Sequence, residues 1–205
     1  MPIEVVEVVA GDVVSIAEIM LYVQAPTAAD NELLQSLIRS SVLETQRRTG
    51  RKLLTHTINL WLSEFPDNEQ PILIPFPPLL TIEEITYIDG DNTEQSLDPA
   101  DYFADAKSQP GRVLLAFDAS WPDTASVGIA DHPHPVKVQF TCGFGDTGDD
   151  ITDDLKTIVK GLTKLIFDNP NPVEVGGAQP VVVPLHINSL IESNKDQTEY
   201  PAGTW

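Results

Sequence analysis

The sequence of 205 residues contains little cysteine, little positive charge and no long apolar run. Its single cysteine, Cys142, excludes a disulfide within the chain. No apolar stretch reaches the roughly 18 residues that a membrane-spanning helix needs, so we expect no contact with a membrane. Residues 1–12 include acidic side chains where a secretory signal peptide has basic ones, so we do not expect a secreted protein.

Basic residues are scarce, because 12 Lys and Arg stand against 31 Asp and Glu, which makes the formal net charge −19. Proteins that hold nucleic acid neutralise its phosphates with a basic face, so this composition argues against an ordinary nucleic-acid binder. Two interpretations of the acidic excess stay open. It confers solubility, or it forms a surface past which DNA moves without being held.

Motifs of catalytic and nucleotide-binding sites are also missing from the sequence. There is no P-loop and no Rossmann glycine pattern, and the glycines that follow Cys142 lack the lysine of a phosphate-binding loop. No serine, histidine and aspartate residues are spaced in a way that indicates a catalytic triad. We therefore expect a protein that is not an enzyme and that needs no cofactor.

Two groups of residues resemble metal ligands only in part. His132 and His134 stand two residues apart, but a metal site needs three or four ligands and no third one is suitably spaced. The acidic residues of 146–154 do not follow the order of an EF-hand loop, and a negatively charged helix start explains them better. His56 is interpreted as an ordinary strand residue. An alternative function, a small metal-dependent hydrolase, would use His132, His134, Asp146, Asp149, Asp150, Asp153 and Asp154.

A long helix is predicted between Asp30 and Gly50. Asp30 is predicted to cap its first turn, and Gly50 to end it in the left-handed conformation. The face predicted to be buried is an apolar stripe at helical spacing. It consists of Leu33, Leu34, Leu37, Ile38 and Val42.

A basic cluster, defined as Arg47, Arg48, Arg51 and Lys52, lies at the C-terminal end of this helix. These residues are four of the 12 basic residues in the chain. They complement the negative end of the helix dipole, or they bind an acidic partner such as a second copy of this chain. Two charges suffice for the dipole and four are present, so both interpretations are kept.

The remaining chain has helical spacing at both ends and strand spacing between them. Ser15 and Glu18 have the spacing of a capping box, and a second long helix is predicted from Thr152. Alternating apolar residues and turn signals predict a block of short antiparallel strands over residues 53–145. The sequence therefore predicts an α+β fold, a bundle of two long helices plus shorter helices with an inserted β block.

We expect three segments along the chain. Residues 1–14 form an N-terminal arm or an edge strand, and residues 15–191 form one domain. Within that domain, residues 15–52 and 152–191 make the helical body and residues 53–145 make the β block. Residues 192–205 are polar, contain proline and form a C-terminal tail.

Several stretches, in this order and spacing, resemble the head-to-tail connector proteins (adaptor or head-completion proteins) of tailed bacteriophages and related prophages. The similarity covers residues 15–191 and leaves out residues 1–14, the NPNP stretch and residues 194–205. The matching stretches are SIAEIMLYV, DNELLQSLIRSSVLETQRRTGRKLLTHTINLWLSEFP, ILIPFPPLLTIEEITYIDGD, QSLDPADYFADAKSQPGRVLL, SWP, VKVQFTCGFGDTGDDITDDLKTIVKGLTKLIF and VPLHINSLI.

This resemblance implies a structural subunit of the virion neck that is assembled in the cytoplasm of the bacterial host. Proteins of this family form a homo-oligomeric ring, commonly a dodecamer, beneath the portal protein. The ring extends the DNA channel and binds a stopper or tail-completion protein. The implied partners are thus the portal, the stopper, other copies of the chain and genomic DNA that passes without specific binding.

The resemblance also suggests where the partners bind. The C-terminal segment of the family often reaches the portal, which makes Tyr200 and Trp205 candidates for portal docking. A closed ring needs an interface between two different faces, which makes the basic cluster a candidate for contact between subunits. A carbohydrate-binding or receptor-binding module of a virion is kept as a further alternative, because the chain has many short strands.

Overall fold

The computed structural model describes residues 2–24, 31–67, 70–125, 133–169, 182–198 and 200. Within these residues the chain forms four α-helices and two antiparallel sheets with eight strands in all, which confirms the predicted α+β class. The chain divides into two compact units. The β unit comprises Met1–Val9, Thr55–Phe144 and Asp196–Trp205, and the helical unit comprises Ala10–Leu54 and Gly145–Lys195. The division into arm, domain and tail stays a prediction.

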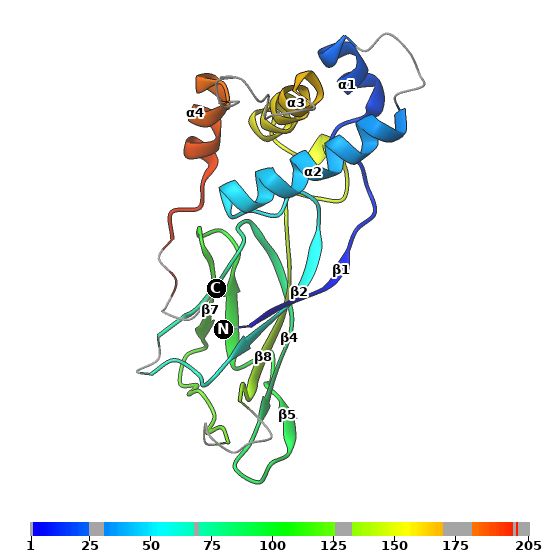
Figure 1. Cartoon of the computed structure of the whole chain (residues 1–205). Helices are drawn as coiled ribbons and strands as arrows, with labels where there is room; N and C mark the ends of the chain where they lie inside the picture. Colours follow the sequence, from blue (N-terminus) through cyan, green and yellow to red (C-terminus); the bar gives the residue numbers. More distant parts are fainter. Residues whose placement is uncertain are drawn as a thin grey trace, which may run out of the picture. The chain divides into compact units, whose positions relative to one another are not determined.

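The first sheet of the β unit has five strands in the order β1-β2-β8-β4-β5 (Figure 1). Strands β2 and β8 bury every second residue, as predicted from their alternation, because successive side chains point to opposite faces. Strand β1 pairs with β2 at the edge, so the N-terminal residues form an edge strand. The strands are β1 (Ile3–Val8), β2 (His56–Leu62), β4 (Leu79–Ile88), β5 (Glu94–Ser96) and β8 (Val136–Cys142).

The second sheet of the β unit has three strands in the order β3-β7-β6, which are β3 (Ile72–Ile74), β7 (Gly111–Leu115) and β6 (Tyr102–Asp105). Both sheets contribute side chains to one apolar core. Phe140 and Val138 come from the first sheet, whereas Ile74 and Val113 come from the second. The core also includes Cys142, which is buried and not in a disulfide.

The turn between β4 and β5 lies at residues 89–92, within the stretch where the sequence predicts short antiparallel strands. The carboxylate of Asp89 accepts hydrogen bonds from the amides of Asp91 and Thr93 at 3.0 and 2.9 Å. These bonds, the one from Thr93 first, hold the pKa of Asp89 below its ordinary value. The Asp89 side chain thus stabilises the hairpin by accepting hydrogen bonds from the backbone of its own turn.

The helical unit contains α1 (Ile16–Val23), α2 (Asn31–Thr49), α3 (Asp153–Asp168) and α4 (Leu185–Asn194), with the short 3-10 helix η2 (Gly148–Asp150) before α3. Helix α3 contacts each of the other three α-helices (Figure 1). Along the described residues, no helix is both long enough and apolar enough to cross a membrane. Helix α1 begins with the predicted capping box, in which Glu18 and Ser15 each bond the other's backbone amide.

Helix α2 ends as predicted, because Gly50 has φ +70° and its amide donates to the carbonyl of Gln46 at 2.9 Å. Asp30, the predicted cap, lies outside the described residues. The predicted apolar stripe is partly wrong. Leu34 and Ile38 are buried, but Leu33 is 52% exposed.

The buried face of α2 continues through three small polar residues, Ser41, Thr45 and Thr49. The threonine hydroxyls donate to the carbonyls one turn earlier, at 2.7 Å each, so their polar atoms are satisfied inside the unit. Helix α3 likewise buries Gly161, where an added Cβ would lie 2.5 Å from the side chain of Ile187 in α4. Small residues therefore set how closely these helices pack.

Candidate functional site

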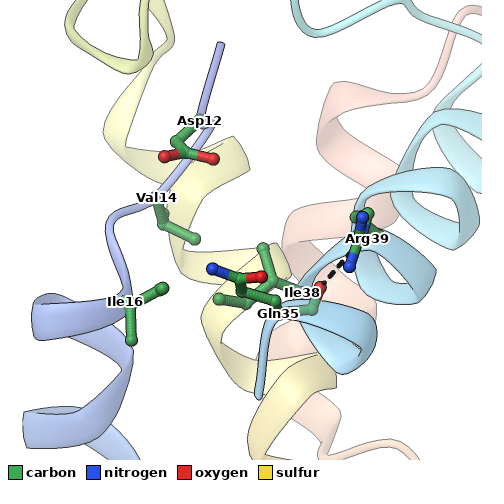
Figure 2. Close-up of a pocket in the computed structure, with 6 residues that line it drawn as sticks. All are labelled: Asp12, Val14, Ile16, Gln35, Ile38 and Arg39. Atoms are coloured by element: carbon green, nitrogen blue, oxygen red, sulfur yellow. Dashed lines mark hydrogen bonds between the residues drawn. The ribbon is translucent and has the colours of Figure 1, made fainter. Parts of the chain in front are cut away.

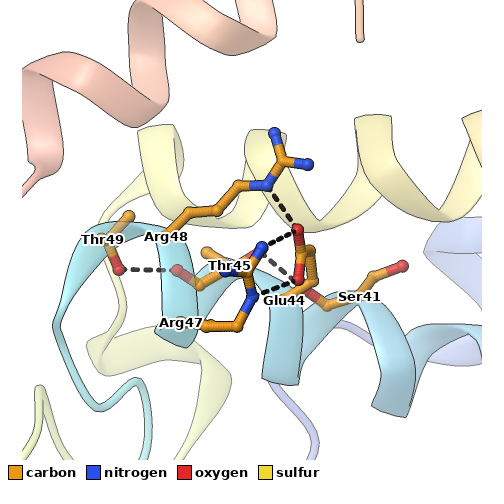
Figure 3. A network of polar contacts seen from close by, with 6 residues as sticks. All are labelled: Ser41, Glu44, Thr45, Arg47, Arg48 and Thr49. Carbon is orange, nitrogen blue, oxygen red and sulfur yellow. Dashed lines mark hydrogen bonds and ion pairs between the residues drawn. The ribbon is translucent and has the colours of Figure 1, made fainter. Parts of the chain in front are cut away.

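The basic cluster begins with two arginines that bind one glutamate of their own helix (Figure 3). Arg47 donates from Nε and Nη2 to the two carboxylate oxygens of Glu44 at 2.8 Å each, and Arg48 donates to the same carboxylate. The hydrogen bond from Arg47 is the largest cause that lowers the pKa of Glu44 to about 2. The Arg47 side chain is 70% exposed, so its charge still faces solvent.

The other two members of the basic cluster have partners within the chain. Arg51 donates from Nε to the carbonyl of Asn194 at 2.7 Å, which joins the ends of α2 and α4. Lys52 also has an interaction within the chain. Arg47 is thus the most exposed member of the cluster, and a contact between subunits at this cluster stays a prediction.

Tyr200 lies in a small network of its own segment. Its hydroxyl donates to one carboxylate oxygen of Asp196 at 2.7 Å, and the amide and hydroxyl of Thr198 donate to the other oxygen. These three hydrogen bonds therefore all lie within residues 196–200. Trp205, the second candidate for portal docking, lies outside the described residues, and docking by either residue stays a prediction.

The helical unit has a hollow of about 180 Å³ between residues 12–16 and helix α2 (Figure 2). Its apolar lining comes from Val14, Ile16 and Ile38, and its polar lining from Asp12, Gln35 and Arg39. Figure 2 shows Asp12 and Arg39 on opposite sides of the hollow. The hollow is therefore lined by apolar and polar side chains together, with an acidic residue on one side and a basic residue on the other.

Arg39 lines one side of this hollow. Its Nε donates to the carbonyl of Gln35 at 3.3 Å within α2, and in the described part of the chain it forms no salt bridge. Sequence reasoning missed the hollow because residues 12–14 have no clear periodicity. Only the fold brings them beside α2.

A second hollow of about 190 Å³ lies beside the first and shares Asp12 and Val14 with it. Its lining includes Ser15, Glu18, Thr147, Asp149 and Lys156. Glu18 accepts a hydrogen bond from Lys160 at 2.9 Å, which is the largest cause that lowers its pKa to about 2. Lys160 thus compensates the charge of one carboxylate at this hollow, that of Glu18.

Two residues of the metal-dependent alternative have other side-chain partners. The carboxylate of Asp150 accepts from the amide and hydroxyl of Thr147, and Asp153 pairs with Lys156 at 3.4 Å. His134 has a buried Nδ1 without a hydrogen-bond partner in the described structure, and His132 lies outside it. The described residues contain no group of three or more side chains suited to a metal ion, so this alternative rests on sequence alone.

The charge of the chain is divided unequally between the two units. The β unit has eighteen acidic and three basic residues, a net charge of −15. The helical unit has thirteen acidic and nine basic residues, a net charge of −4. The acidic excess seen in the whole sequence is therefore chiefly a property of the β unit.

Three solved structures share this fold, each at 20% sequence identity. A chain from the "neck of empty GTA particle computed with C6 symmetry" matches with a TM-score of 0.76 and 100% coverage of both chains. A chain from the "virion of native gene transfer agent (GTA) particle" matches at 0.75 with 98% coverage of both. A chain from the "neck of native GTA particle computed with C12 symmetry" matches at 0.72 with 100% coverage of both.

No protein-family model matches this sequence, and no curated protein matches it either. The structural likeness nevertheless extends over essentially the whole of each chain. The predicted resemblance to connector proteins is therefore confirmed at the level of the fold.

Proposed function

We propose that this chain is a structural subunit of the neck of a tailed, phage-like particle. It forms a ring beneath the portal protein, extends the DNA channel and joins the capsid to the stopper or the tail. The observation on which this proposal depends is the end-to-end likeness to chains of necks described with C6 and C12 symmetry. The matching stretches over residues 15–191 support the same function.

The charge distribution supports a role at a DNA channel. A ring of about twelve copies would have a formal charge on the order of −200. Phosphates that pass such a wall are repelled rather than bound, so the genome meets little resistance to sliding. The β unit, with a net charge of −15, is the part best suited to face the passing DNA.

The remaining parts of the chain receive roles within the same ring. The two long helices α2 and α3 form the body around which the shorter helices pack. The basic cluster contacts an acidic face of the neighbouring subunit, and Tyr200 and Trp205 contact the portal. The protein is assembled in the host cytoplasm and resides in the neck of the virion.

Electron microscopy of the purified protein, incubated with the portal of the same particle, tests the proposal. We expect ring-shaped density attached to one face of the portal. A monomer in the absence of portal is compatible with the proposal, because the portal can template the ring. Failure to bind the portal would overturn it, and stoichiometric zinc or calcium in the purified protein would favour the hydrolase instead.

A further inference from the structure

Phe117 in the β unit is exposed to an unusual degree, with 95% of its surface open to solvent. It lies at a turn that follows β7, where the amide of Ala119 donates to the carbonyl of Ala116 at 3.1 Å. Asp118, the next residue, has φ +60°. Turn positions usually hold small or polar residues, so a phenyl ring at this position calls for an explanation.

The hollow of the helical unit is large enough for a phenyl ring and offers it apolar contacts beside polar ones. Its volume is about 180 Å³, and its apolar lining comes from Val14, Ile16 and Ile38. An apolar cavity of about 150 Å³ admits benzene, whereas pockets for cofactors and drug-sized ligands start at about 300 Å³. The hollow is therefore suited to one inserted side chain rather than to a small-molecule ligand.

The charges beside the ring and beside the hollow are complementary. Asp118 follows Phe117, and its carboxylate has no ion-pair or hydrogen-bond partner among the residues described. Arg39 at the side of the hollow forms no salt bridge within the same residues. Asp12 lies on the opposite side from Arg39, so only one orientation of an inserted turn avoids repulsion between carboxylates (Figure 2).

We propose that Phe117 of one copy inserts into the hollow of a second copy, where Asp118 pairs with Arg39. The inference rests on the proposed ring function and names one contact between its subunits. The inserting turn and the receiving hollow are different surfaces of one chain, so each copy can receive one neighbour and enter the next. Such a heterologous contact closes into a ring when the rotation between copies allows it.

Cross-linking between copies tests this contact directly, because the only native cysteine, Cys142, is buried. Two differently tagged variants, D118C and R39C, are mixed with portal and exposed to a mild oxidant. We expect a disulfide that joins the two tags. The matched control pairs D118C with S193C, an exposed position in α4, and should give no joined product. A D118C–S193C product at the same yield as the D118C–R39C product would overturn the inference.

Assembly measurements on substituted proteins provide a second test. F117A should reduce ring formation on the portal by about tenfold or more, as expected for an aromatic anchor. F103A is the matched control, since Phe103 is a second exposed phenylalanine of the β unit, and it should assemble like the wild type. Because Phe117 touches little in its own chain, the melting temperature of F117A should equal that of the wild type.

Reversal of charge identifies the ion pair. R39E and D118R should each weaken assembly, and the double variant R39E/D118R should restore it to within about threefold of the wild type. Normal rings from F117A, with no cross-link between D118C and R39C, would overturn this contact and leave the proposed function intact. Failure of the wild type itself to bind the portal would instead overturn the proposed function.

Discussion

The two units of this protein differ in how far basic residues compensate their acidic residues. In the helical unit, acids pair with nearby bases, as in Glu18 with Lys160 and Lys164 with Asp168. In the β unit only three basic residues face eighteen acidic ones, so most carboxylates there have no basic counterpart. The paired acids of the helical unit therefore support local structure. Some acids of the β unit do so too, as Asp89 does in its turn, but most of them lack a base, and under the proposed function this excess repels a polyanion.

The largest expected effect concerns the core of the β unit. Phe140 in β8 is fully buried, so F140A should lower the free energy of unfolding by about 3–5 kcal/mol through lost burial and a cavity. The matched variant L155A empties a fully buried position of α3 and should cost about 2–5 kcal/mol. Denaturant titration of both variants measures this. A change below 1 kcal/mol for either variant would contradict the packing described.

A smaller effect is expected at the end of α2. Gly50 has φ +70°, a backbone conformation in which any residue with a Cβ atom is strained. The variant G50A should therefore destabilise the helical unit by about 1 kcal/mol. Thermal unfolding followed by circular dichroism measures this change. G90A is a suitable control, because a Cβ atom at Gly90 in the β unit would meet no atom within 4 Å. Equal losses in both variants would show that backbone conformation is not the cause.

The ion pairs of the helical unit should contribute less still, and in a pH-dependent way. E44Q should cost about 0.3–1 kcal/mol at neutral pH, because the pair with Arg47 is partly exposed. The pKa of Glu44 is lowered from 4.5 to about 2 in the folded chain, so its contribution is complete above pH 4.5. It is lost as the pH falls towards 2. Unfolding titrations of the wild type and E44Q should therefore converge in acid, and a constant difference down to pH 2 would contradict the pairing.

The smallest effect on stability is expected from unpaired acids of the β unit. Glu64, Asp91 and Asp101 are exposed, and their carboxylates have no salt bridge among the described residues. The triple variant E64Q/D91N/D101N should change the free energy of unfolding by less than about 0.5 kcal/mol. Its affinity for DNA at low salt should nevertheless rise. A large loss of stability would show that these acids serve folding after all.

Local signals in the sequence predicted the parts of the fold that depend on neighbouring residues. Ser15 and Glu18 sit three residues apart and cap one helix turn, and Gly50 ends α2 through its own backbone freedom. The alternation in β8 likewise follows from the two-residue period of a strand. These features need no information from distant parts of the chain, which is why the sequence was sufficient.

The sequence was insufficient where distant residues meet. The apolar stripe of α2 was misjudged because hydropathy gives no weight to Thr45 and Thr49, whose hydroxyls bond within the helix when buried. The pairing of Arg47 with Glu44 follows from helical spacing, but Arg51 meets Asn194 across 143 positions of sequence. The hollow beside Arg39 likewise requires residues 12–16 to return to α2.

The chain crosses from one unit to the other four times, after residues 9, 54, 144 and 195. No single cut of the gene can therefore release either unit whole. A single recombination event between two related genes would yield a hybrid in which both units are mixed. Exchanging one unit alone would require recombination at all four crossings. The strongly acidic β unit and the weakly acidic helical unit are therefore inherited together.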